Sequence, residues 1–344
     1  MQKFIKIFLV NITIFLLLII ILELIYGNKI YPNKLNCGYL LCSNNHSYKN
    51  NLYEGKNFIN YKKDKYGFRG LRKNISQIDI LTIGGSTTDE RYLETEDTWS
   101  EQLERKINNT YPKFDIDIVN AGIDGQSTYG HIWNFKNWFP KIKKFKTKYV
   151  FFYIGINEYF SNEKHVYDQG TKYLNYFQKI KLWVKENNGI IYKSYDLVYR
   201  KYFLKDILNV GHQIREKKYI IVEKEFFISQ ANTKDLELRL DKLKELTINI
   251  NAIPVFITQK TLRHKIINDK IYSINKINYF SKEKKISKII LNYCKKNKIF
   301  CIDLFNKIEF GEDSLYDLIH ATPEGANRIA NTIFNEFNLI LNKN

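Results

Sequence analysis

The chain has 344 residues, 44% of them hydrophobic and 26% charged, values close to the averages of folded proteins. This composition excludes a largely disordered chain, and the length allows one large domain or two smaller ones. The net charge of +18 is compatible with nucleic acid, anionic lipid or an acidic glycan as partner. Because lysine is spread along the whole chain and no nucleic-acid-binding motif occurs, no specific nucleic-acid partner is expected.

Residues 1 to 27 are predicted to form an N-terminal membrane anchor. Within them, residues 7 to 26 read IFLVNITIFLLLIIILELIY and are almost wholly apolar. About 20 such residues are enough to cross a bilayer as one helix. No small-residue cleavage site follows, which argues against a removed signal peptide. Lysines flank the segment on both sides, so their distribution determines the orientation only weakly. The preferred orientation places the following domain on the extracytoplasmic face.

Residues 28 to 63 are predicted to be a juxtamembrane connector with little core of its own, because they are rich in Asn, Tyr, Lys and Gly. Cys37 and Cys42 lie within it and could close a small disulfide loop if the segment is outside the cytoplasm. Cys294 and Cys301 lie between a predicted helix and a predicted strand, where two buried thiols are an equal alternative. Neither pair has zinc-ligand spacing, and no metal or cofactor is expected.

Strand-like and helical patterns alternate from residue 64 to the end of the chain. The strand-like runs are residues 78 to 84, 114 to 121, 149 to 155, 252 to 258 and 299 to 305, and the helical patterns are residues 97 to 108, 129 to 143, 234 to 250 and 284 to 297. Strands that are apolar on both faces and are separated by amphipathic helices are typical of a parallel sheet covered on both sides. The sequence therefore predicts a doubly wound α/β domain over residues 64 to 344.

This alternation is interrupted at about residues 159 to 233, where aromatic and basic residues interleave. The favoured interpretation is an inserted helical subdomain packed against the core. A segment of this composition could also lie on a membrane surface or cover a binding site.

The first predicted strand ends abruptly in Gly84, Gly85 and Ser86. Glycines allow the backbone to turn where side chains would clash, so a small hydroxyl residue can be presented at the end of a sheet. Ligands of doubly wound sheets bind at the carboxyl ends of the strands, and Ser86 follows such an end. Ser86 is therefore a candidate nucleophile, provided that a base and oxyanion donors lie nearby.

Residues suited to those roles follow the other predicted strands. Gly125 comes after the second strand and could turn its backbone N–H toward a developing charge, while Asn157 comes after the third and could donate from its side-chain amide. After the last strand Asp317 precedes His320 by three residues, a spacing that puts both on one side of a loop or helical turn. Asp317 would orient the imidazole, which would take the proton from Ser86.

A helix is predicted to begin directly after this pair, with Thr322 as its cap and Pro323 as its first residue. The candidate base would thus immediately precede a rigid element. The remaining histidines have no partner at a useful spacing and are interpreted as surface or structural residues: His46, His131, His165, His212 and His264.

The ordered set of serine, glycine, asparagine, and aspartate with histidine resembles the SGNH hydrolases, the GDSL-type esterase and lipase family. The matching segments are IGGSTT, NAGIDGQST, GINE and DLIH, and the similarity covers about residues 64 to 341 without most of the insertion. The upstream segment YGFRG resembles the lead-in of membrane-anchored bacterial members. The resemblance implies a flavodoxin-like three-layer sandwich with Ser86, His320 and Asp317 as the catalytic triad. It also implies an oxyanion hole made by the N–H groups of Ser86 and Gly125 and the amide of Asn157.

Two positions depart from the family pattern. Gly85 replaces the aspartate of the usual Gly-Asp-Ser, and Glu158 replaces the aspartate of the usual Gly-x-Asn-Asp. Neither position supplies a group that the mechanism requires, so the departures concern the substrate more than the chemistry. The other serine-hydrolase pattern, Gly-x-Ser-x-Gly, is excluded because Thr88 occupies its last position.

The sequence thus predicts a membrane-anchored esterase that removes an O-acyl group, an acetyl group by resemblance, from a cell-envelope glycan through an acyl-Ser86 intermediate. An O-acyltransferase would use the same triad and oxyanion hole. A lipid esterase is the runner-up for the substrate, because of the anchor and the aromatic and basic insertion. The alternative from another class is a catalytically silent glycan-binding or assembly protein of the same fold. The acyl chain, the acceptor and the oligomeric state stay open.

Overall fold

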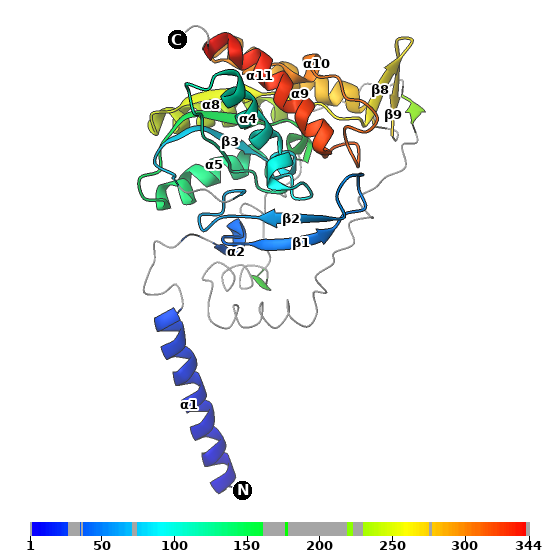
Figure 1. The fold of residues 1–344 in the computed structure, drawn as a ribbon. Helices are drawn as coiled ribbons and strands as arrows, with labels where there is room; N and C mark the ends of the chain where they lie inside the picture. Colours follow the sequence, from blue (N-terminus) through cyan, green and yellow to red (C-terminus); the bar gives the residue numbers. More distant parts are fainter. Residues whose placement is uncertain are drawn as a thin grey trace.

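A computed structural model of the chain describes residues 2–26, 35, 37–70, 74–160, 176–177, 219–222, 230–274 and 277–341 (Figure 1). Most of the predicted insertion at residues 159 to 233 lies outside the described residues.

The centre of the fold is a five-stranded parallel sheet with the strand order β10-β7-β5-β3-β4. Its strands are β3 (Ile78–Gly84), β4 (Ile118–Asn120), β5 (Thr147–Tyr153), β7 (Ile253–Ile257) and β10 (Cys301–Ile302). The chain steps from β3 to β4 on one side and then crosses to β5 on the other side of β3. This reversal makes a topological switch point between β3 and β5, the place where ligands bind in doubly wound sheets. The predicted doubly wound α/β fold is confirmed.

Helices cover both faces of the sheet and make a three-layer sandwich (Figure 1). One face packs on α4 (Trp99–Thr110) and α11 (Pro323–Leu341). The other packs on α5 (Thr128–Asn137), α8 (Gln230–Asn249) and α9 (Tyr279–Asn297). The β5 sequence shows why both faces are covered: Tyr149, Phe151 and Tyr153 enter one core, and the alternate residues Val150 and Phe152 enter the other.

Two of the predicted strands are shorter than expected. The run at residues 114 to 121 contributes only Ile118–Asn120, because the Asn108 side chain of α4 bonds both the N–H and the carbonyl of Ile116, at 2.7 and 2.9 Å, and keeps that residue out of the sheet. The run at residues 299 to 305 contributes only Cys301–Ile302, because Asp303 caps the short helix α10 (Leu304–Lys307) by accepting the N–H of Asn306. Side-chain hydrogen bonds to the backbone end both strands early.

The segment predicted to be a connector with little core differs in the structure. Strands β1 (Asn45–Lys49) and β2 (Phe58–Lys62) pair antiparallel, after the short helix α2 (Cys37–Leu40). The hairpin has a core cluster of its own, made by Tyr48, Leu52, Ile59 and Tyr61. The polar composition of the segment concealed this core, because two of the four buried residues are tyrosines, which supply apolar surface as well as a hydroxyl. The hairpin packs against the loops that follow β3 and β10, so it forms part of the globular body.

The N-terminal helix α1 (Gln2–Tyr26) extends away from this body (Figure 1). Its segment Gln2–Leu24 has a mean hydropathy of 2.9, and none of it is buried. By length and composition it could cross a membrane, and a signal sequence has the same properties.

Both cysteine pairs form disulfides, Cys37 with Cys42 and Cys294 with Cys301. The first encloses helix α2, and the second ties the C-terminal part of α9 to β10. The alternative that Cys294 and Cys301 are two buried thiols is therefore wrong.

Several short elements complete the described chain. A three-stranded sheet in the order β6-β9-β8 contains β6 (Ile220–Ile221), β8 (His264–Ile267) and β9 (Lys270–Ser273). The remaining elements are the short helix α3 (Ser86–Asp89) and the 3-10 turns η1 (Thr95–Asp97), η2 (Phe139–Lys141) and η3 (Ile156–Phe160).

Candidate active site

Ser86 is the first residue of helix α3, directly after β3 and a pair of glycines. Both glycines are needed because the turn is crowded. A Cβ on Gly84 would lie 2.1 Å from Thr88 Oγ1, and a Cβ on Gly85 would lie 2.2 Å from Asn157 Nδ2. The structure therefore confirms that side chains at these two positions would clash. The amide of Asn157 is one of the groups that a side chain at Gly85 would meet.

His320 lies beside Ser86 although 234 residues separate them in sequence. Its Nε2 is 2.8 Å from Ser86 Oγ, and its Nδ1 is 2.6 Å from Asp317 Oδ2. With Nδ1–H donating to the carboxylate, Nε2 is left as an acceptor for the serine hydroxyl proton. The structure thus joins the three candidate side chains in one continuous hydrogen-bonded chain.

The loop that carries Asp317 and His320 also binds the carboxylate through its own backbone. Asp317 Oδ1 accepts the N–H of Ile319 at 3.1 Å and the N–H of His320 at 2.8 Å. Burial would raise the pKa of Asp317, but the hydrogen bond and charge of His320 and these backbone N–H groups outweigh it and lower the pKa below its ordinary value. The carboxylate is therefore ionised over the range in which His320 would act as a base.

The C-terminal end of this loop is attached to helix α11. Thr322 Oγ1 accepts the N–H of Gly325 at 3.2 Å, which confirms Thr322 as the helix cap and Pro323 as the first helical residue. A Cβ on Gly325 would lie 1.9 Å from the carbonyl oxygen of Ser314, so only glycine allows the loop to lie against the helix here. His320 thus precedes a rigid element, as the sequence predicts.

Asn157 and the loop that carries Gly125 lie beside the glycine turn before Ser86, since a Cβ on Gly85 would be 2.2 Å from Asn157 Nδ2 and 2.9 Å from the carbonyl oxygen of Gln126. Asn157, in η3 after β5, donates from Nδ2 to the carbonyl oxygen of Gln126 at 2.6 Å. An amide has two N–H donors, so one is left for another acceptor. Gly125 has a φ of +74°, a conformation that favours glycine, and in the described part of the chain no backbone acceptor is seen for its N–H. Ser86 adds a third donor, because the first N–H groups of a helix have no intrahelical acceptor.

A buried ion pair fixes the turn that carries Asn157. The carboxylate of Glu158 accepts from the N–H and the hydroxyl of Thr128, at 2.7 and 2.9 Å, and pairs with the guanidinium of Arg239 at 3.0 Å. Arg239 comes from α8, donates to Thr128 Oγ1 at 2.6 Å and lies over the ring of Tyr129. Glu158 therefore joins η3 to the first turn of α5 and to α8, which gives the second departure from the family pattern a structural role.

A signal for Arg239 was present in the sequence. It lies among Leu236, Leu240 and Leu243, at the spacing of a buried helix face, and a charged residue at such a position has a buried partner. The sequence analysis did not identify it as a supporting residue.

Gln259, after β7, is a second supporting residue that the sequence analysis missed. Its side-chain oxygen accepts the N–H of Ile156 at 2.7 Å, and its Nε2 donates to Thr87 Oγ1 at 2.9 Å and to the Tyr153 carbonyl at 3.1 Å. It thus joins the exit of β5 to the turn after Ser86. A lone glutamine after a strand carries no local pattern that would reveal these contacts.

Charged groups buried behind helix α3 connect it to the N-terminal hairpin. Asp89 is 1% exposed, accepts the hydroxyl of Tyr61 at 2.8 Å and lies 3.3 Å from Lys63 Nζ. Burial would raise the pKa of Asp89, but Lys63, Arg91 and Arg69 outweigh it and lower the pKa. Because Lys63 also donates to the Gly122 carbonyl at 3.0 Å, the hairpin supports both the serine turn and the loop that carries Gly125.

His131 and His264 are both buried, in agreement with their interpretation as structural. His131 Nδ1 lies 3.2 Å from Gln126 Oε1, and burial lowers its pKa to about 3, so its ring is neutral. His165 and His212 lie outside the described residues. Among the residues that the structure describes, no three His, Cys, Asp or Glu side chains group so that they could hold a metal ion.

No family model matches the sequence, and no curated protein matches it. Among solved structures, a member of the lipolytic protein G-D-S-L family from Veillonella parvula DSM 2008 has 14% identity, covering 76% of this chain and 98% of that chain, with a TM-score of 0.43. A catalytic mutant of an acetylxylan esterase from Geobacillus stearothermophilus has 13% identity, with 75% and 93% covered and a TM-score of 0.43. An alpha/beta hydrolase enzyme from the metagenome of Lake Arreo, Spain, has 12% identity, with 77% and 98% covered and a TM-score of 0.45.

Proposed function

We propose that the chain is a membrane-anchored serine esterase that removes an O-acetyl group from a cell-envelope glycan through an acyl-Ser86 intermediate. The observation that carries the proposal is the hydrogen-bonded chain from Ser86 through His320 to Asp317, with distances of 2.8 and 2.6 Å. A hydroxyl, an imidazole and a buried carboxylate in this order are the groups that acyl transfer to a serine requires.

In the first half-reaction, Ser86 Oγ attacks the ester carbonyl carbon and its proton moves to His320 Nε2. Asp317 holds the imidazole in the required tautomer and stabilises the imidazolium. The oxyanion of the tetrahedral intermediate accepts hydrogen bonds from the N–H groups of Ser86 and Gly125 and from the free N–H of the Asn157 amide. His320 then gives its proton to the leaving sugar oxygen as the C–O bond breaks, which leaves the acetyl group on Ser86.

In the second half-reaction, water replaces the sugar hydroxyl. His320 takes a proton from the water as its oxygen attacks the acyl carbon, and the proton returns to Ser86 Oγ as the acyl-oxygen bond breaks. Acetate leaves and the free enzyme is restored. An acceptor sugar in place of water would make the same residues an acetyltransferase.

Side chains beside the site suit a hydroxylated substrate better than a long alkyl chain. The ring of Tyr316 stacks on the ring of His320 with centroids 5.7 Å apart, and the ring of Tyr92 meets Tyr316 edge to face at 6.4 Å. Arg91 pairs with Asp124, next to Gly125, at 3.4 Å. Aromatic faces with adjacent charged groups can contact the apolar and the hydroxylated edges of a sugar ring.

Two further features support the location. Helix α1 has the length and hydropathy of a membrane anchor. The two disulfides favour an oxidising compartment outside the cytoplasm. We infer that the uncleaved helix holds the domain close to the extracytoplasmic face of the membrane, within reach of envelope glycans.

The full chain in detergent micelles tests the activity. We expect it to hydrolyse p-nitrophenyl acetate faster than p-nitrophenyl octanoate, and to release acetate from an O-acetylated oligosaccharide in amounts equal to the acetyl groups lost. The Ser86→Ala variant should release none, whereas Ser76→Ala, in the loop before β3, should match the wild type. Preference for the octanoate ester would favour a lipid esterase, and transfer of acetyl groups to an added acceptor sugar without free acetate would favour a transferase. A folded chain that turns over no ester would be catalytically silent.

A further inference from the structure

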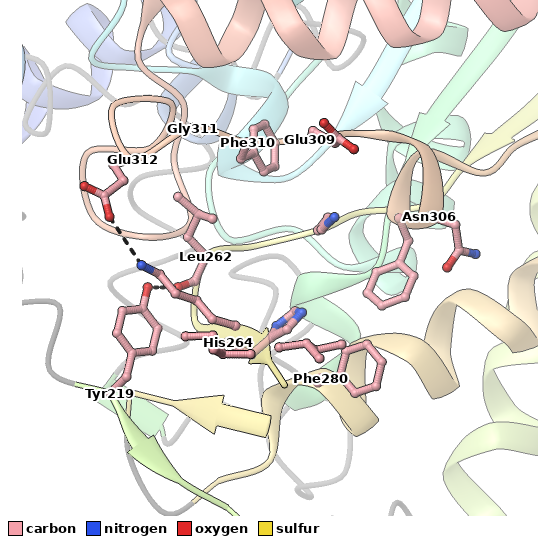
Figure 2. A pocket seen from close by; sticks show the side chains of 14 residues that line it. Tyr219, Leu262, His264, Phe280, Asn306, Glu309, Phe310, Gly311 and Glu312 are labelled. Atoms are coloured by element: carbon pink, nitrogen blue, oxygen red, sulfur yellow. Dashed lines mark hydrogen bonds and ion pairs between the residues drawn. The ribbon is translucent and has the colours of Figure 1, made fainter. Parts of the chain in front are cut away.

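A cavity lies beside the β8-β9 hairpin, and it contains none of the residues of the Ser86 site. Its volume is about 590 Å³, within the range of sites that hold small organic ligands. Figure 2 shows it enclosed by the hairpin, by the first residues of α9 and by the loop between α10 and Ser314. Nothing in the proposed esterase mechanism uses these residues.

Aromatic side chains make up much of the cavity wall. The rings of Phe280 and Phe305 flank the imidazole of His264, with centroids 5.3 and 6.4 Å from it. Figure 2 shows the His264 ring directed into the cavity beside Phe280, with Phe310 on the far side. Tyr219 closes one end. Such walls suit a flat or chain-like apolar group.

Two lysines line this apolar space, and one of them, Lys260, has N–H donors that are not used by the described residues. The amine of Lys260 donates to the carbonyl oxygen of Ile308 at 2.8 Å, and an ammonium group has three N–H donors. No ion pair is seen for it within the part of the chain that the structure describes. Burial lowers the pKa of Lys260, which means that its surroundings do not fully compensate the charge. An anion in the cavity would supply the missing compensation.

Three carboxylates lie in or beside the lining. Glu309 lines the cavity but is exposed, and its charge only partly offsets the effect of burial on the pKa of Lys260. Glu312 is already paired with Lys265 at 3.4 Å, and its side chain is 87% exposed. Glu283 lies behind His264, is fully buried and pairs with Arg263 at 3.2 Å. His264 Nδ1 faces that carboxylate at 3.7 Å, while burial lowers the pKa of His264 and keeps its ring neutral near pH 7. Lys260 is thus partly buried and has no ion pair among the described residues, whereas the two carboxylates of the lining, Glu309 and Glu312, are exposed.

We propose that this cavity binds a small amphipathic organic acid, with its apolar body between Phe280, Phe305 and Phe310 and its carboxylate on Lys260. The site is separate from the esterase function proposed above. It is nevertheless connected to the histidine loop, because the Leu262 N–H of the cavity wall donates to the carbonyl oxygen of Leu318, between Asp317 and His320, at 2.9 Å.

Binding can be measured by isothermal titration calorimetry on the full chain in detergent micelles, with empty micelles as the blank. Three probes of the same shape differ only in charge: 2-naphthoate, neutral 2-naphthamide and cationic 2-naphthamidine. We expect 2-naphthoate to bind most tightly and the amidine least tightly. In Lys260→Met, which keeps the apolar stem, 2-naphthoate affinity should fall roughly tenfold or more while 2-naphthamide affinity changes little.

Two further variants serve as a control and as a second test of the cavity. Lys265→Met at the rim should change 2-naphthoate affinity less than about threefold, because its charge is exposed and paired. Phe310→Ala removes part of the wall and should weaken 2-naphthoate and 2-naphthamide equally, a readout that remains if Lys260→Met does not fold. Absence of 2-naphthoate binding, equal affinity for the three probes, or insensitivity to both Lys260→Met and Phe310→Ala would overturn the proposal. None of these readouts depends on ester hydrolysis.

Discussion

The two sides of the Ser86 site are built in opposite ways. On the base side, Asp317 and His320 lie three residues apart in one loop, and the backbone of that loop binds the carboxylate. On the oxyanion side, Asn157 is positioned by Glu158, which is held in turn by residues of α5 and α8. A local loop thus supplies the base, whereas packing between distant elements supplies the oxyanion donor. Substitutions on the base side should affect activity alone, and those on the oxyanion side should affect stability as well.

The largest effect is expected for the base. His320→Gln removes the proton acceptor for Ser86, and kcat/KM for p-nitrophenyl acetate should fall about 10⁴-fold or more. The free energy of unfolding should change by less than about 1 kcal/mol, because the side chain is 25% exposed and the backbone of the loop still binds the Asp317 carboxylate. His46→Gln, on β1, serves as the control and should keep full activity. A His320→Gln variant that retains most of its activity would remove His320 from the proposed mechanism.

On the oxyanion side, the buried ion pair gives the largest expected effect on stability. Glu158→Gln leaves the guanidinium of Arg239 buried without a counter-charge and should lower the free energy of unfolding by about 3 kcal/mol. The control is Glu324→Gln, which breaks an exposed pair with Arg328 on α11 and should cost at most about 0.5 kcal/mol. Chemical denaturation of both variants measures the difference. Equal losses would mean that burial does not distinguish the two pairs.

Asn157→Ala tests the oxyanion donor itself, independently of the buried ion pair that positions it. It removes one donor to the developing negative charge, so kcat should fall roughly 10²- to 10³-fold while KM changes little. Steady-state kinetics with p-nitrophenyl acetate provide the measurement, and Asn74→Ala, in the loop before β3, is the matched control. A change confined to KM would instead assign Asn157 to substrate binding.

The smallest effect concerns pH. His131 contacts the Gln126 side chain on the oxyanion side, and burial lowers its pKa from 6.5 to about 3. Between these values the unfolded chain binds a proton that the folded chain does not. The stability that this histidine contributes is therefore complete above pH 6.5 and is lost as the pH falls toward 3, by about 1.4 kcal/mol per pH unit.

Denaturant unfolding at pH 7 and pH 5 measures this slope. His131→Gln should reduce the difference in the free energy of unfolding between these two pH values by about 2 kcal/mol, and His46→Gln should leave that difference unchanged. An unaltered slope in His131→Gln would mean that the ring is not held neutral.

The same contrast explains how much the sequence could predict. The alternation of strands and helices, Ser86 after a glycine turn and the Asp317 and His320 spacing are all carried by neighbouring residues, and the structure has them where the patterns place them. The contacts of Gln259 join segments far apart in the chain, and no local pattern encodes them. For Arg239 the buried helix face indicates that a partner exists, but the identity of that partner, Glu158, is again a contact between distant segments.

The N-terminal hairpin shows a different limit. Its tyrosines count as polar residues in the sequence, yet Tyr48 and Tyr61 are buried. The hydroxyl of Tyr61 donates a hydrogen bond to Asp89. A tyrosine can supply apolar surface and a hydrogen bond together, so composition alone underestimates a core built from it. This is why a segment predicted to be a connector is part of the support of the serine turn.

The most direct test of the proposed chemistry is the reactivity of Ser86 itself. The folded full chain would be treated with a fluorophosphonate and the modified peptide identified by mass spectrometry. We predict labelling at Ser86, none in Ser86→Ala and much slower labelling in His320→Gln, because a serine reacts only when a base takes its proton. A folded wild-type chain that is not labelled, or a Ser86→Ala variant labelled to the same extent, would contradict the assignment of Ser86 as a nucleophile.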